Sequence, residues 1–202
     1  AGPGGLKLDL ASQAYELTGS KSRFVEFGNA PGQDFELDVQ FDSTNWVTDF
    51  GIFLGYDERP YETPDTEQVL GSAQLIWIQA TSPVAADSTL QVRRSLEWIN
   101  RESADLFALD WGFFPLWQPS SFADLNYRLK VVVREGRLEE IWFSGQPIPE
   151  LVGIPHDERA ESRGFGTRGR FGVFIRGGGQ VWLKDVTFRR LAVSPRASGQ
   201  NS

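Results

Sequence analysis

The sequence contains no cysteine and no methionine, and His156 is its single histidine. Without cysteine the chain can form neither a disulfide framework nor a thiolate zinc site. The absence of cysteine does not identify a compartment, because cytosolic, periplasmic and extracellular proteins can all lack it. Since methionine is missing even at position 1, we expect the chain to be a processed product or a piece of a longer protein.

Long apolar runs are missing as well. No stretch reaches the roughly 18 apolar residues of a membrane-spanning helix, and no basic, hydrophobic leader is present. The formal net charge of -7 disfavours binding to phosphate backbones and to anionic membrane surfaces, which depends on lysine and arginine. We therefore expect neither a nucleic acid partner nor membrane insertion.

The residues that are abundant favour strands and turns. The 202 residues include 15 Phe, 7 Trp, 21 Gly and 11 Pro, and no long helical periodicity is present. A chain of this length commonly forms one all-β sandwich domain. We expect that domain over residues 13–193, with a linker or cloning remnant at 1–12 and a disordered polar tail at 194–202.

The clearest strand is predicted at residues 35–42. Its odd positions are all apolar, and its even positions are Glu, Asp or Gln, so one face is expected in the core and the other in water. Further strands are predicted at 15–17, 23–27, 49–56, 73–79, 88–98, 131–133 and 138–143. Long polar loops are expected at 57–70 and at 145–168, and a helical turn is expected to begin near Ser120.

The last two strands are predicted to form a hairpin. Residues 169–176 are rich in Phe, Val and Ile, the triple glycine 177–179 follows, and residues 180–193 alternate between apolar and polar. Two such runs joined by a short glycine-rich segment are typical of a β-hairpin.

A polar strand face beside aromatic residues predicts a carbohydrate site. Sugars stack their C–H faces on Trp and Tyr rings and bond through their hydroxyl groups to amide, carboxylate and guanidinium groups. The candidate binding residues are Trp77, Gln79, Gln91, Arg93, Glu97, Trp111 and Trp117. Trp111 and Trp117 are equally consistent with core positions, whereas Trp46, Trp98, Trp142 and Trp182 are expected to fill the core.

The sequence offers little for a metal or cofactor. Calcium is the one realistic cation, and the acidic residues that could hold it are Asp57, Glu58, Glu62, Asp65 and Glu67. Their spacing matches no known loop motif, so we expect a solvated acidic loop and no cofactor. His156 could act as a general base only if a neighbouring group oriented it, and its sequence neighbours do not show this.

The order of segments over roughly residues 33–193 carries a resemblance. These segments are F-E-L-D-V-Q-F, G-I-F-L, W-I-Q, N-Y-R-L-K-V-V-V-R-E-G-R-L-E-E-I-W-F-S-G-Q-P-I and G-R-F-G-V-F-I-R-G-G-G-Q-V-W-L-K-D-V-T-F-R-R-L. The order resembles concanavalin-A-like lectin and glucanase sandwiches, and most closely the 3-keto-disaccharide hydrolase-type domain of bacteria. The resemblance implies a jelly roll of two antiparallel sheets with long loops, and an extracellular or periplasmic location.

The resemblance does not extend to catalytic motifs. In that family the strand that corresponds to residues 51–54 is usually followed by Arg, and here Gly55 stands in that place. The strand that corresponds to residues 77–79 usually reads E-V-Q, and here Trp77 replaces the Glu and only Gln79 matches. In the laminarinase-like branch the strand motif is E-x-D-x-x-E, and here Glu36 and Asp38 are followed by Phe41 in place of the second Glu. The resemblance therefore implies the fold and leaves the catalytic residues unknown.

The sequence is consistent with three functions. The first is a non-catalytic, lectin-like module that binds carbohydrate or another small polar ligand within a larger bacterial protein. The second is a glycoside hydrolase that acts through Glu36, Asp38, Asp49 or Glu97. The third is a structural or protein-interaction domain, which predicts an exposed apolar patch in place of a polar site.

Overall fold

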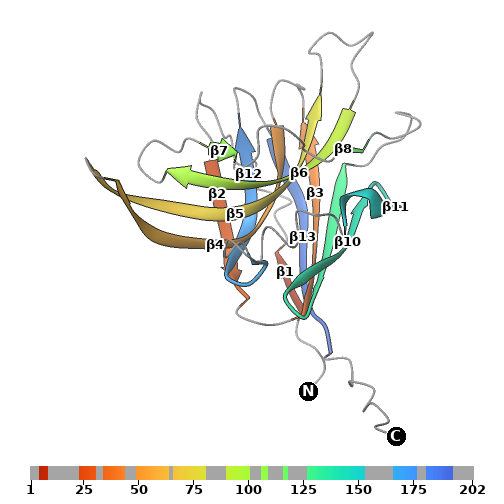
Figure 1. Ribbon diagram of the computed structural model, residues 1–202. Coiled ribbons are helices and arrows are strands. Elements are labelled where there is room, and N and C mark those ends of the chain that lie inside the picture. Colours follow the sequence, from red (N-terminus) through yellow and green to blue (C-terminus); the bar gives the residue numbers. More distant parts are fainter. Residues whose placement is uncertain are drawn as a thin grey trace, which may run out of the picture.

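The chain folds into two antiparallel β-sheets that pack face to face, as Figure 1 shows for the computed structural model. This is the predicted all-β, jelly-roll sandwich. The structure describes residues 5–8, 23–30, 34–43, 49–63, 66–80, 90–100, 106–108, 116–117, 127–152, 166–176 and 181–192. Among these residues no helix is long and apolar enough to span a membrane.

The first sheet, called here the β3 sheet, has six strands. In spatial order they are β1 (Gly5–Leu8), β13 (Val181–Arg190), β3 (Phe35–Ser43), β9 (Arg128–Arg134), β10 (Arg137–Phe143) and β11 (Gln146–Pro147). A short 3-10 helix, η1 (Pro149–Leu151), follows β11.

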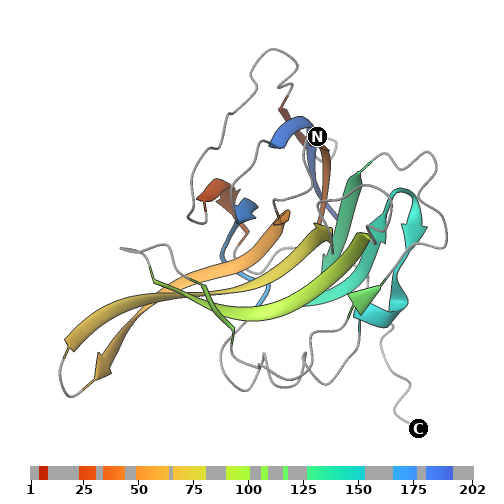
Figure 2. The same cartoon turned by 90° about the horizontal axis from the view of Figure 1, so that it is seen from above.

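The second sheet, called here the β5 sheet, carries the candidate site. Its strands are β2 (Arg23–Asn29), β12 (Arg170–Arg176), β4 (Asp49–Thr63), β5 (Thr66–Ala80), β6 (Leu90–Asn100) and β7 (Leu106–Ala108), with β8 (Leu116–Trp117) also paired to β6. Strands β4, β5 and β6 are long and strongly curved (Figure 2).

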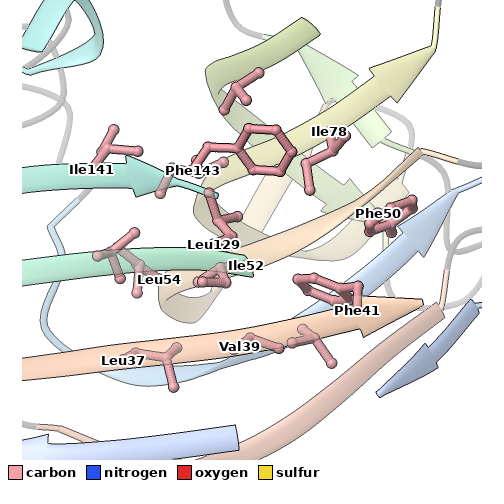
Figure 3. Packing of buried hydrophobic residues seen from close by; sticks show 14 of the residues in the cluster. Leu37, Val39, Phe41, Phe50, Ile52, Leu54, Ile78, Leu129, Ile141 and Phe143 are labelled. Carbon is pink, nitrogen blue, oxygen red and sulfur yellow. The ribbon is translucent and has the colours of Figure 1, made fainter. Parts of the chain in front are cut away.

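The core lies between the two sheets and follows from the period-2 pattern. In β3 the odd residues 35–41 are buried, as predicted, and the even residues 36–40 are partly exposed. The buried odd residues face Phe50, Ile52 and Leu54 of β4 across the sandwich (Figure 3). Each fully buried Phe, Leu or Ile side chain stabilises the fold by roughly 1.5–3 kcal/mol.

The predicted hairpin of the last two strands is wrong. Strand β12 pairs with β2 and β4 in the β5 sheet, whereas β13 pairs with β1 and β3 in the β3 sheet. The chain therefore passes from one sheet to the other at this point. A strand, a glycine run and a second strand have the same local pattern whether the chain returns alongside itself or crosses to the facing sheet.

The expected acidic loop at 57–70 is also largely wrong, because β4 and β5 extend through most of it as a paired arm that reaches Thr63 and Thr66. Pro60 lies within this arm, opposite Val69. Strand β12 pairs with β4 only as far as Tyr56, so beyond that residue β4 has no partner on its other side among the described strands. A proline is tolerated there because no ladder hydrogen bond is required of it.

Two further expectations need correction. Gly5–Leu8, within the segment expected to be a linker, forms β1 and pairs with β13. Trp142 and Trp182 are half-buried on the outer face of the β3 sheet and do not fill the core, and Trp98 is also only partly buried. Phe, Leu, Ile and Val side chains make up most of the core instead. Trp46, the strand at 15–17, the turn near Ser120 and the tail at 194–202 lie outside the described residues.

Candidate functional site

The outer face of the β5 sheet, turned away from the core, gathers polar side chains at one end. Because side chains alternate along a strand, the neighbours of the core residues on β12, β4, β5 and β6 all point to this face. The register places Trp77 opposite Arg93 and Gln79 opposite Gln91, and Arg176 opposite Asp49. We call the following residues the polar cluster: Asp49, Gln79, Gln91, Arg93, Ser95, Glu97 and Arg176.

Arg176 is bonded at the centre of the polar cluster. Its Nε and Nη2 atoms donate to Oδ2 of Asp49 at 3.1 and 2.9 Å, and its Nη1 lies 3.8 Å from Oε1 of Glu97. Nε2 of Gln79 donates to the same Asp49 oxygen at 3.4 Å. One guanidinium group thus lies between two carboxyl groups that come from different strands.

Glu97 is almost completely buried, with 2% of its surface exposed. Its Oε1 accepts a hydrogen bond from the Ser95 hydroxyl at 2.7 Å, while Oε2 has no hydrogen-bond partner among the described residues. Burial raises the pKa of Glu97 above its usual value, the Ser95 hydrogen bond and Arg176 oppose this rise, and the charge of Asp49 adds to it. A buried carboxyl oxygen without a partner costs free energy, so this position requires an explanation.

Asp49 is in a similar environment. Burial raises its pKa, and the charge and hydrogen bonds of Arg176, the Gln79 amide and the charge of Arg93 act in the opposite direction. The two carboxyl groups therefore both hold protons more tightly than free side chains do. Groups with shifted pKa values gather at functional sites.

Arg93 has a different kind of partner. Its Nε and Nη2 atoms both donate to Oε1 of Gln91, at 3.1 and 2.8 Å, and it forms no ion pair with any carboxylate in the described part of the chain. Arg176, by contrast, is paired with Asp49. Arg93 therefore presents a positive charge, held in place by a neutral amide, on a half-buried side chain.

Arg94, on the opposite face of β6, holds this strand in position from beneath. It is fully buried and donates to the Leu151 carbonyl of η1 at 2.9 Å and to Oε1 of Gln74 at 2.8 Å. The sequence pattern identified Arg94 as an interruption of the apolar face of this strand. Its hydrogen bonds explain how the core accommodates that charge, because buried charges require polar partners.

Trp77 does not offer a free ring for stacking. Only 2% of its surface is exposed, the Arg176 guanidinium carbon lies 5.2 Å from the ring centroid, and Phe174 packs edge-on at 6.5 Å. It belongs to a second apolar cluster on this face, together with Phe53 and Leu75. Gly51 lies between Phe174 and Trp77 in the register and leaves room for the two rings.

Five of the seven predicted binding residues thus lie on one face: Trp77, Gln79, Gln91, Arg93 and Glu97. The backbone of Trp117 pairs with Val92 in β6, but its side chain is outside the described residues, as is all of Trp111. Arg176 was missed because the pattern of β12 gives only an apolar strand that ends in arginine. The only indication of a role for Arg176 is the opposite charge of Asp49. That relationship can be recognised only once β12 and β4 are known to pair.

The acids Glu36 and Asp38 are on the other side of the sandwich, on the outer face of the β3 sheet. Asp38 accepts from Nε of Arg128 at 2.7 Å, and Glu36 lies 3.9 Å from Arg189. Arg128 also reaches Asp185 at 3.6 Å. These residues form a partly exposed ion-pair network apart from the polar cluster.

No group of three or more potential metal ligands occurs within the described ranges. Of the acidic residues considered for calcium, Glu58 accepts from the Tyr56 hydroxyl at 3.1 Å and pairs with Arg170 at 3.0 Å. The side chains of Glu62 and Glu67 are not described, and Asp65 and His156 lie outside the described residues.

No protein-family model and no curated protein matches this chain, so the resemblance to the 3-keto-disaccharide hydrolase-type domain is not confirmed. Among solved structures, a β-porphyranase from the human gut bacterium Bacteroides plebeius is similar to it, with a TM-score of 0.39 and 8% identity. The match covers 83% of this chain and 66% of that one. A similarity this low carries no argument about activity, and the fold assignment rests on the sheets themselves.

Proposed function

We propose that this domain binds a saccharide at the polar cluster. The observation that supports the proposal is the row of fixed hydrogen-bonding groups that Arg176, Asp49, Gln79 and Gln91 form across four adjacent strands. Rigid sheet positions hold such groups more precisely than loops do.

The chemistry of these groups suits sugar hydroxyls. A hydroxyl both donates and accepts, so neighbouring carboxylate, amide and guanidinium groups can bond successive hydroxyls of one ring. The side chains of Arg176 and Asp49 remain 34% and 16% exposed, so a ligand can reach them without unfolding the sheet. Trp77 then acts beneath the site, where its ring supports the guanidinium group of Arg176.

A screen of the purified chain against neutral and acidic oligosaccharides tests this proposal, with thermal shift and product mass measured in the same wells. The proposal predicts ligand-dependent stabilisation that is lost in Gln79→Ala and retained in a distant control, Arg134→Gln. Arg134 pairs with Glu139 in the β3 sheet. If no saccharide stabilises the chain, the proposal is wrong and the interaction-domain alternative gains weight.

A second candidate function is cleavage of a glycosidic bond, favoured by the two carboxyl groups on either side of Arg176. Glu97, with its raised pKa, is suited to donate a proton to the leaving oxygen, and Asp49 to activate water on the opposite side of the sugar. The hydrogen bonds that Arg176 and Gln79 donate to Oδ2 of Asp49 weigh against this role, because they lower the proton affinity that a general base needs. New product masses that disappear in Glu97→Gln would favour cleavage over binding alone.

A further inference from the structure

The hydrogen bonds of Arg93 leave one edge of its guanidinium group without an acceptor among the described residues. Nε and Nη2 both bond the same oxygen of Gln91, which uses the side edge of the planar group. Nη1 and the second hydrogen of Nη2 form the end edge, and no residue in the described part of the chain accepts from them. This end edge is the fork that pairs with a carboxylate through two parallel hydrogen bonds.

Within the described ranges, no carboxylate forms an ion pair with Arg93. Arg93 interacts electrostatically with Asp49, but this carboxylate already accepts hydrogen bonds from Arg176 and Gln79. Gln91 fixes the orientation of the guanidinium group without neutralising it.

We propose that the saccharide bound at the polar cluster is acidic, and that its carboxylate or sulfate group binds the end edge of the Arg93 guanidinium. This inference rests on the proposed function, since it places the anionic group of the same ligand. Neutral hydroxyls of the sugar bond Gln79, Asp49 and Arg176, and the anion lies next to them on β6.

The negative charge of the whole chain does not oppose this. The net charge of -7 is spread over 202 residues, and salt screens exposed charges beyond about 8 Å at physiological ionic strength. At contact distance the fixed guanidinium group of Arg93 dominates the electrostatic interaction with the anionic group of the ligand. Such complementary charges contribute to specificity more than to affinity.

Matched pairs of probes test the inference on the full chain. One pair is a galacturonic acid trimer and its methyl ester, and the other is a sulfated galactose oligomer and its desulfated counterpart. We expect the charged member of at least one pair to bind about tenfold more tightly or better, as charge-assisted bonds allow. Which pair shows the preference distinguishes carboxylate from sulfate.

Variants locate the charge preference. Arg93→Gln should abolish the difference in affinity between the charged and neutral members of that pair, Arg93→Lys should keep part of this difference, and Arg134→Gln should keep all of it. Added salt should weaken the charged member alone, which tests the preference in the unaltered chain even if Arg93→Gln does not fold. Equal binding of charged and neutral members, or a preference that survives Arg93→Gln, overturns the inference but not the proposed function. If no saccharide binds in the broader screen, both are overturned.

Discussion

Arg176 and Asp49 join two neighbouring strands across the outer face of the β5 sheet, with Nη2 and Oδ2 2.9 Å apart. Asp49 begins β4 and Arg176 ends β12, so antiparallel pairing brings the two charges together in register. The same guanidinium group covers Trp77 and approaches Glu97. The stability of this part of the sheet and the proposed binding of a saccharide therefore depend on the same few atoms.

Replacing Arg176 with methionine should destabilise the fold. The change leaves the partly buried Asp49 carboxylate without its cation, and it uncovers the ring of Trp77. We expect a loss of about 1–3 kcal/mol in the free energy of unfolding, measured by urea titration at neutral pH. The matched variant Arg134→Met, at an exposed pair, should lose less than about 1 kcal/mol. Equal effects of the two variants would contradict this role for Arg176.

The raised pKa of Glu97 predicts how stability depends on pH. Its pKa is higher in the folded chain than the usual 4.5, so the folded state binds the proton more tightly than the unfolded state does. Its contribution to stability is therefore complete below about pH 4.5 and is lost as the pH rises through the folded pKa. Glu97→Gln mimics the protonated form at every pH, so its stability relative to the unaltered chain should increase as the pH is raised.

Urea unfolding of both proteins between pH 4.5 and 7.5 measures this difference. Asp49→Asn should show a change of the same sign, because burial raises the pKa of Asp49 as well. A difference that stays constant or decreases with pH would show that Glu97 is not held in this environment.

Trp77→Ala should behave as a core substitution. Because only 2% of Trp77 is exposed, we expect a loss of about 3–5 kcal/mol and a clear drop in melting temperature. Trp142→Ala is the control, since Trp142 is half-buried on the outer face of the β3 sheet beneath Lys130. Normal melting of Trp77→Ala combined with lost sugar binding would instead identify Trp77 as a surface of the ligand site.

Gly51→Ala should also be destabilising, because a Cβ atom at this position would overlap the Ile76 carbonyl oxygen and the backbone of Trp77. We expect a cost of about 2–3 kcal/mol in chemical denaturation, typical of an overpacked interior. Gly28→Ala is the matched control, because its Cβ would meet the Phe171 ring at an ordinary 3.6 Å. A mild effect at Gly51 would mean that β5 can move aside.

The sequence predicted the strands whose pattern is local. Alternation in residues 35–42 gave both the strand and its buried face, and the same pattern in β6 identified its polar face and the unusual position of Arg94. These predictions succeed because successive side chains of a strand point to opposite faces. A shift of one residue would turn every apolar side chain from the core to the solvent, so the alternation determines which face is buried.

The predictions that were wrong concern features that depend on strand pairing between segments distant in the sequence. The separation of β12 from β13 and the extension of β4 beyond Tyr56 are decided by which strands lie alongside them. The composition of the candidate site also depends on which strands pair. Gln91, Arg93 and Glu97 could be grouped on one strand face, but Arg176 could be added only once β12 was known to lie next to β4.

The most direct test is a crystal structure of the chain with the best-binding saccharide from the screen. We expect a sugar on the outer face of the β5 sheet, hydrogen-bonded to Asp49 and Gln79, with any anionic group at Arg93. A sugar bound on the outer face of the β3 sheet, or anywhere away from these residues, would show that the polar cluster is not the binding site.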